Sequence, residues 1–197
     1  HPWHFTRTKN NRPFSSLQAH HLIVSESMND DEIRECCLEN SYDINSHENG
    51  VMLPFYKDLA CLLSVPVHNT NHKYGKTDSE DTVPETYLNY PRAVEEKLLG
   101  LLEQIEEGDI CKAPDPQEEF IASMNDISIK ILKKINDEKW TITGAGKNYH
   151  KESPDGCKNM NKKKPCEFRS NGEEHNIINS NGAQIKRDAD QKLEIGK

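Results

Sequence analysis

Three short stretches between residues 18 and 74 decide the fold, and they read Gln18-Ala19-His20-His21-Leu22, Asn49-Gly50-Val51-Met52-Leu53-Pro54 and His68-Asn69-Thr70-Asn71-His72-Lys73-Tyr74. Together they contain four histidines. Neutral imidazole is the commonest protein metal ligand, and a metal held by three nitrogen atoms keeps a fourth position open for a substrate oxygen. Three of these histidines are therefore enough to bind a metal ion, while the fourth remains to accept a proton.

The first two stretches predict a pair of short strands. The β-favouring residues after His21 indicate a first strand at about residues 18–24. Asn49-Gly50 is a strong turn signal, and a second strand is expected after it at residues 51–53. Helical patterns flank this second strand at residues 29–38 and 55–64.

The third stretch allows two interpretations. Residues four apart on one helix share a face, so His68 and His72 would both reach one ion from the same helix. The residues between them are poor helix formers, however, and Asn71 is a good helix cap. In the second interpretation a helix begins near His72, and His68 binds from the preceding loop.

All three motifs occur in the order Ala-His-His, Asn-Gly and His-x-x-x-His-x-Tyr. On these motifs the chain resembles the AHH-type toxin nucleases of the HNH/endonuclease VII superfamily, from about Gln18 to Tyr74 and again around Tyr90 to Leu102. The resemblance implies an α+β fold with a ββα-metal (HNH) core and added helices.

The resemblance also implies roles for individual residues. His21 would be the general base that takes a proton from water, while His20, His68 and His72 would hold the metal ion. Asn49 would tie the loop between the strands through hydrogen bonds to the backbone. Because neighbouring side chains on a strand point to opposite faces, His20 and His21 fit these roles only at a strand end, with His20 inward and His21 at the rim.

One divalent metal ion is the expected cofactor. With no carboxylate among its ligands, the site is expected to prefer Zn²⁺, Ni²⁺ or Mn²⁺ over Mg²⁺, although cellular abundance keeps Mg²⁺ as a candidate. Lys73, Tyr74 and Arg92 are candidate phosphate contacts for substrate binding.

The chain is expected to divide into a lead-in, a core, a packing helix and a tail. Apolar residues at helical spacing predict long helices at residues 91–107 and 115–135, which form a C-terminal helical hairpin. The expected boundaries are an extended lead-in at 1–17, the nuclease core at 18–112, the packing helix at 113–143 and an irregular polar tail or small subdomain at 144–197.

Composition limits the function classes. A net charge of −8 counts against broad attraction to nucleic acid, although the first 14 residues hold Arg7, Lys9 and Arg12 without an acidic residue. Six cysteines without regular spacing favour reduced thiols over a disulfide framework. No apolar run approaches the roughly 20 residues needed to cross a bilayer, so no membrane partner is expected.

We therefore expect a metal-dependent endonuclease that hydrolyses DNA with little sequence specificity. The resemblance implies the toxin domain of a secreted antibacterial effector, attached to a larger delivery polypeptide on its N-terminal side. It would act in the cytoplasm of the target cell and be neutralised by a cognate immunity protein. Two alternatives remain, namely an RNA-cleaving toxin of the same fold and a non-catalytic zinc-binding interaction module.

Overall fold

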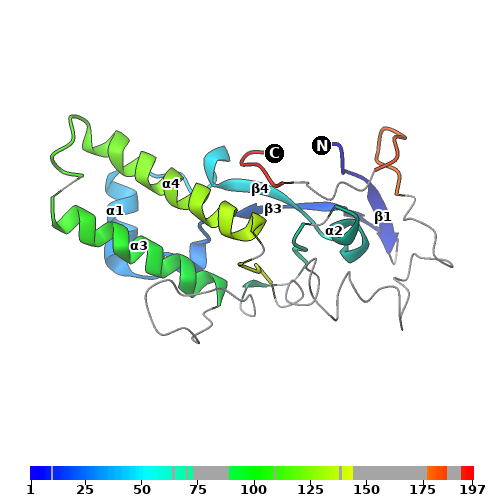
Figure 1. Ribbon diagram of the computed structural model, residues 1–197, viewed down its shortest axis with the longest axis horizontal. Helices are drawn as coiled ribbons and strands as arrows, with labels where there is room; N and C mark the ends of the chain where they lie inside the picture. The colour runs from blue at the N-terminus through cyan, green and yellow to red at the C-terminus, as the bar shows by residue number, and fades with distance from the viewer. Residues whose placement is uncertain are drawn as a thin grey trace.

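The computed structural model describes residues 1–9, 11–63, 65–69, 71–72, 89–108, 110–137, 139–143, 177–185 and 192–197. Across these residues the fold is mixed α and β, with two small antiparallel sheets and four α-helices (Figure 1). In chain order the elements are β1 (Thr6–Lys9), β2 (Arg12–Ser15), β3 (Leu17–His21), η1 (Ser25–Ser27), α1 (Asp31–Glu39), η2 (His47–Asn49), β4 (Gly50–Pro54), α2 (Lys57–Leu63), α3 (Tyr90–Glu106) and α4 (Pro116–Asn136).

The residues expected as an extended lead-in form a hairpin of β1 and β2. Arg7 of β1 donates two hydrogen bonds to the buried carboxylate of Asp58 in α2, at 3.1 and 2.5 Å. Its guanidinium lies 4.6 Å from the centre of the Tyr56 ring, within the range of a cation–π contact. The hairpin is thereby attached to α2, the helix that follows β4.

The predicted pair of strands is confirmed, with an earlier end to the first strand. β3 and β4 are antiparallel, and His20 lies opposite Val51 while His21 lies opposite Gly50. β3 ends at His21 because the next two amides turn to Asn49. The amide of Leu22 donates to the backbone oxygen of Asn49 at 2.8 Å, and the amide of Ile23 donates to the side-chain Oδ1 of Asn49 at 2.7 Å.

The helices predicted from apolar spacing are confirmed within a few residues. α1, α3 and α4 each begin after a residue whose side-chain oxygen accepts a backbone N–H, as good helix caps do, and these residues are Asp30, Asn89 and Asp115. α3 is followed by Gly108, whose φ of +81° is a conformation that favours glycine. Among the described residues, no helix is long and apolar enough to cross a membrane.

α3 and α4 lie side by side over much of their length (Figure 1). Their facing residues join the hydrophobic core together with Trp140 and with Leu17, Val51 and Leu53 of the β3–β4 pair. The core residues that these two helices contribute are Tyr90, Ala93, Val94, Leu98, Leu101, Leu102, Phe120, Met124, Ile127, Ile131, Leu132 and Ile135.

Two segments of the predicted tail contact the rest of the protein, while residues 144–176 lie outside the described part. The amide of Gly196 donates to the oxygen of Gly50 at 2.8 Å, and the amide of Met52 donates to that of Lys197 at 2.9 Å. The segment 192–197 therefore pairs with the edge of β4 that β3 leaves open (Figure 1). In the segment 177–185, the amide of Ser180 donates to the oxygen of His4 at 2.7 Å.

The cysteines depart from one expectation. Cys36, Cys37 and Cys111 are free, as predicted, but Cys61 in α2 takes part in a disulfide bond. The expectation of reduced thiols is therefore wrong at Cys61. Spacing along the chain could not show this, because a disulfide depends on how closely two cysteines approach in space.

Candidate metal centre

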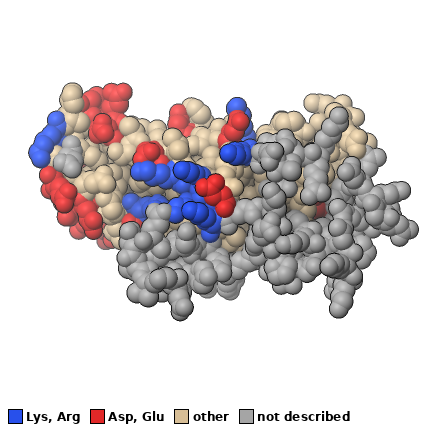
Figure 2. Space-filling view, in the orientation of Figure 1, with Lys and Arg blue, Asp and Glu red and all other residues tan. Residues whose placement is uncertain are grey.

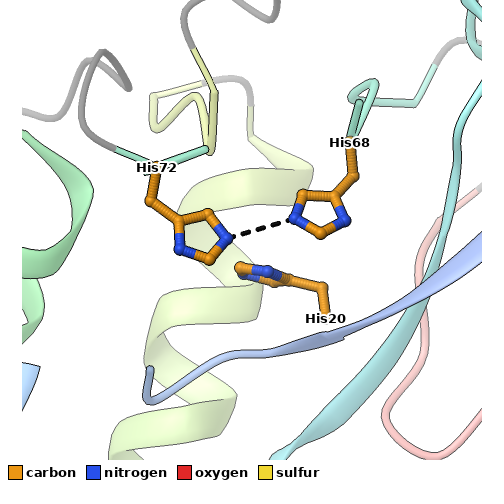
Figure 3. A group of neighbouring side chains, drawn as sticks. All are labelled: His20, His68 and His72. Carbon is orange, nitrogen blue, oxygen red and sulfur yellow. Dashed lines mark hydrogen bonds between the residues drawn. The ribbon is translucent and has the colours of Figure 1, made fainter. Parts of the chain in front are cut away.

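His20, His68 and His72 form a compact cluster from three parts of the chain (Figure 3). One ring nitrogen from each lies within 4.8 Å of the corresponding nitrogens of the other two. His20 is supplied by β3, next to the strand end. His68 is held beside β4 because its backbone amide donates to the oxygen of Pro54 at 2.8 Å. Residues distant in sequence are therefore brought together by the β3–β4 pair and the chain that follows α2.

The described residues of the His-x-x-x-His motif favour the second of its two interpretations, in which His68 lies in a loop. Residues 66–69 and 71 are outside helix and strand, so His68 and His72 do not project from one continuous helix. His68 is instead presented by a loop, and His72 is already in a helical conformation. The helix predicted to begin near His72 would continue into residues 73–88, which lie outside the described part.

The spacing of two of the rings suits a shared ion. Nε2 of His68 and Nε2 of His72 face one another at 3.1 Å, and their rings are nearly parallel at 12° (Figure 3). Zinc–nitrogen bonds of about 2.0–2.1 Å at a tetrahedral angle would place two ligand nitrogens about 3.3 Å apart. The ring centre of His20 lies 4.8 Å from that of His68 and 5.0 Å from that of His72.

Burial keeps these three rings in the neutral form that binds metals. Burial is the main cause that lowers the pKa of His20 well below its ordinary value, and the neighbouring His68 and His72 lower it further. Burial, with a contribution from His72, lowers the pKa of His68 to about 4. For His72, burial lowers the pKa while Glu26 opposes the shift. All three rings therefore offer a lone pair at neutral pH.

The cluster contains ring nitrogens with unused hydrogen-bonding capacity. The Nδ1 atoms of His20, His68 and His72 are buried and have no hydrogen-bond partner among the described residues. Buried polar atoms are ordinarily satisfied, and an unsatisfied one costs about 1–3 kcal/mol. Three neutral imidazoles with spare nitrogens fit a borderline transition metal ion.

Two neighbours of the cluster were not predicted from the sequence. The hydroxyl of Tyr90 lies 3.1 Å from Nε2 of His20, and a carboxylate oxygen of Glu26 lies 3.7 Å from Nδ1 of His72. Tyr90 is the first residue of α3, and Glu26 lies in η1. Tyr90 is the first residue of the second region that resembles the family. No local sequence pattern, however, predicts that Tyr90 or Glu26 contacts a histidine.

His21 lies where the sequence analysis required it. It is the last residue of β3 and is exposed, whereas His20 beside it is only 2% exposed. It directly follows His20 in the chain and lies opposite Gly50, the first residue of β4. The strand end thus separates one imidazole facing the metal-ligand cluster from one facing solvent.

Asn49 ends η2, directly before β4, and is fully buried. Its Oδ1 accepts hydrogen bonds from the amide of Ile23 and from the Ser128 hydroxyl, at 2.7 and 3.1 Å. Its Nδ2 donates to the carbonyl oxygens of Ile23 and Ile44, both at 2.9 Å. These bonds tie together the loop after β3, the segment before β4 and helix α4, so we describe Asn49 as a positioning residue.

Of the three candidate phosphate contacts, the structure describes one. Arg92 is 53% exposed in the first turn of α3, two residues after Tyr90, and forms an ion pair with Glu95 at 2.5 Å. Lys73 and Tyr74 lie outside the described residues.

Comparison with known proteins identifies the family. Residues 6–138 match a family model described as AHH, a nuclease family of the HNH/ENDO VII superfamily with conserved AHH. No curated protein and no solved structure matches the chain. The match spans β3, β4 and all three clustered histidines, and it covers well over half of the chain. The chain therefore belongs to the AHH nuclease family of the HNH/endonuclease VII superfamily.

Proposed function

We propose that this nuclease is a metal-dependent endonuclease that cleaves DNA with little sequence specificity. The observation that carries the proposal is the cluster of His20, His68 and His72 with the exposed His21 at the adjacent strand end. Three residues are suited to hold a divalent metal ion, and the fourth stands beside them in contact with water.

Hydrolysis of a phosphodiester requires an activated water, stabilisation of charge on the phosphate and assistance to the leaving oxygen. A bound divalent ion would supply the charge stabilisation at the phosphate and at the leaving oxygen. His21 would take the proton from the attacking water. Asn49 would hold the backbone after β3 so that the His21 ring keeps its direction.

The distribution of charge supports a polyanionic substrate in spite of the net charge of −8. Figure 2 shows Lys and Arg side chains gathered over the middle of α3 and α4 with some acidic side chains beside them, and further acidic side chains at the end where these two helices are connected. Lys97, Lys130 and Trp140 line the groove between α3 and α4, together with the acidic residues Glu96, Glu119 and Asp126. Trp140 contacts Tyr90 edge-on, with ring centres 5.9 Å apart, so the groove adjoins the metal centre.

Plasmid nicking tests the proposal. Wild-type protein with a divalent ion is expected to nick and linearise a supercoiled plasmid, and a chelator should stop it. His21→Ala should lower the cleavage rate by at least about 100-fold, the lower end of what a general base contributes. Metal content should be unchanged, because His21 is outside the ligand cluster. His47→Ala, which removes another exposed imidazole, is the matched control and should cleave normally.

The outcomes separate the alternatives. Cleavage of total RNA with an intact plasmid would make RNA the substrate. Intact nucleic acids of both kinds, together with unfolding on metal removal, would indicate the non-catalytic zinc module. Cleavage by His21→Ala at the wild-type rate would show that another group accepts the proton.

We also propose that the chain acts as the toxin domain of a secreted antibacterial effector. This rests on the resemblance of its three motifs to AHH-type toxin nucleases. The working site would be the target-cell cytoplasm, delivery would depend on a larger polypeptide, and a cognate immunity protein would protect the producer. Inducible expression in a bacterial cytoplasm should degrade cellular DNA with wild type but not with His21→Ala.

A further inference from the structure

Tyr90 makes two polar contacts with its single hydroxyl group. The hydroxyl oxygen lies 2.7 Å from the carbonyl oxygen of Leu22 and 3.1 Å from Nε2 of His20. A carbonyl oxygen carries no hydrogen, so an oxygen–oxygen contact this short requires the phenolic hydrogen to lie between the two atoms. The hydroxyl has no second hydrogen, and it therefore faces His20 with a lone pair.

This arrangement fixes the position of the proton on His20. A neutral imidazole carries one N–H, and only a donor can satisfy the lone pair of Tyr90, so Nε2 carries the hydrogen. The lone pair of the ring is then on Nδ1. That atom is buried and has no hydrogen-bond partner among the described residues.

We propose that Tyr90 is a positioning residue that holds His20 in the tautomer presenting Nδ1, and not Nε2, to the metal ion. The inference rests on the proposed metal site. It gives the centre mixed coordination, because the Nε2 atoms of His68 and His72 face one another at 3.1 Å. Hydrogen bonds to the second nitrogen of a histidine ligand are the usual means by which proteins select a tautomer and ring direction.

The packing around Tyr90 makes it a rigid support. Its side chain is 0% exposed, and its ring meets Trp140 edge-on at 83°. It also begins α3, whose first turn is capped by Asn89. A hydroxyl placed by a packed helix leaves the His20 ring little freedom to turn its other nitrogen toward the ion.

Nitrogen spectroscopy of the zinc-loaded full chain tests the proposal directly. A long-range proton–nitrogen spectrum should show His20 with a protonated Nε2 and a metal-bound Nδ1, its signals being assigned by their loss in His20→Gln. Metal-bound Nε2 at His20 in the wild type would overturn the proposal. Because this measurement uses the wild type, it decides the question even if a Tyr90 variant does not fold.

Tyr90→Phe tests whether the hydroxyl carries the effect. The variant keeps the ring and its packing but frees Nε2 of His20, and the dissociation constant for Zn²⁺, measured by chelator competition, should rise about 10- to 100-fold. Tyr56→Phe, which removes a hydroxyl that donates to Phe14 at 3.4 Å, is the control and should leave the constant unchanged. Equal zinc affinity in Tyr90→Phe and wild type would exclude the role.

These results are independent of the proposed nuclease activity. If zinc binds through Nε2 of His20 in a wild-type protein that still cleaves DNA, the positioning role of Tyr90 is wrong but the proposed nuclease function stands. If zinc binds through Nδ1 of His20 in a protein that cleaves no nucleic acid, the proposed nuclease function is wrong but the positioning role of Tyr90 stands.

Discussion

Asn49 uses the whole hydrogen-bonding capacity of its amide. Its oxygen accepts two bonds and its nitrogen donates two, and three of the four involve backbone atoms of residues 23 and 44. A buried amide satisfied on all sides fixes its neighbours more than a single bond would. One of these neighbours, Ile23, lies two residues after His21, so Asn49 fixes the backbone that follows the His21 ring.

Replacing Asn49 should therefore destabilise the fold before it affects any chemistry. Asn49→Ala leaves the buried amide of Ile23 and the two carbonyl oxygens without their partner. We expect the free energy of unfolding, measured by urea titration, to fall by about 3 kcal/mol. Asn49→Asp should lower the free energy of unfolding by at least as much as Asn49→Ala, because the second carboxylate oxygen would face the carbonyl oxygens of Ile23 and Ile44.

Asn45→Ala, at an exposed position a few residues earlier, is the control and should change stability by less than about 0.5 kcal/mol. An Asn49→Ala protein with wild-type stability and no cleavage would instead place Asn49 among the residues that touch the substrate.

β4 is paired along both of its edges although the sheet that contains it has two strands. β3 covers one edge, and the segment 192–197 supplies backbone bonds at Gly50 and Met52 on the other. The same segment is anchored by Leu193, which is buried and exchanges hydrogen bonds with the side chain of Asn136 in α4. An exposed strand edge invites pairing with other chains, and this segment prevents it at β4.

Deleting residues 192–197 should lower stability and promote association. Loss of the buried Leu193 side chain alone corresponds to about 2 kcal/mol, and the freed edge of β4 becomes available to a second molecule. Urea unfolding and size-exclusion chromatography measure the two effects. Glu194→Ala, at an exposed position in the same segment, should behave as wild type. Unchanged stability and a monomeric truncated chain would show that the segment does not support the sheet.

Charge is unevenly distributed over the molecule. On the face shown in Figure 2, basic side chains gather over the middle of α3 and α4 with some acidic side chains beside them, and acidic side chains are more frequent toward the end where α3 and α4 are connected. Lys97 lies 5.8 Å from the centre of the Trp140 ring, and Lys130 forms an exposed ion pair with Asp126. Exposed ion pairs are weak, so Lys130 can exchange its carboxylate partner for a phosphate. A chain of net negative charge can thus still have a face that attracts nucleic acid.

Removing the two lysines of this groove should weaken DNA binding in a salt-dependent way. For Lys97→Ala with Lys130→Ala, the magnitude of the negative slope of log K against log salt should decrease by about 2, if each lysine neutralises one phosphate. Fluorescence anisotropy with a metal-free, chelated protein measures this without cleavage. Arg34→Ala with Lys112→Ala removes the same charge from α1 and the α3–α4 connection, and it should leave the slope unchanged. Equal slopes in both double variants would place the DNA path elsewhere.

The sequence by itself determined the local elements and the kinds of residue at the site. Helix caps act over two or three residues, so Asp30 and Asp115 mark the starts of α1 and α4 without reference to the rest of the chain. The side-chain alternation of a strand likewise required one of two adjacent histidines to face inward. The Ala-His-His, Asn-Gly and His-x-x-x-His motifs together indicated the nuclease family, which the family match confirms.

Only the tertiary structure decided which distant groups surround these residues. Tyr90 is 70 residues from His20, and Ser128 is 79 residues from Asn49, so no local pattern connects either pair. The strand partner of β4 at residues 192–197 and the disulfide of Cys61 were equally hidden. Such contacts depend on how helices and sheet pack around one core, because packing brings together side chains whose separation along the chain carries no information about their distance in space.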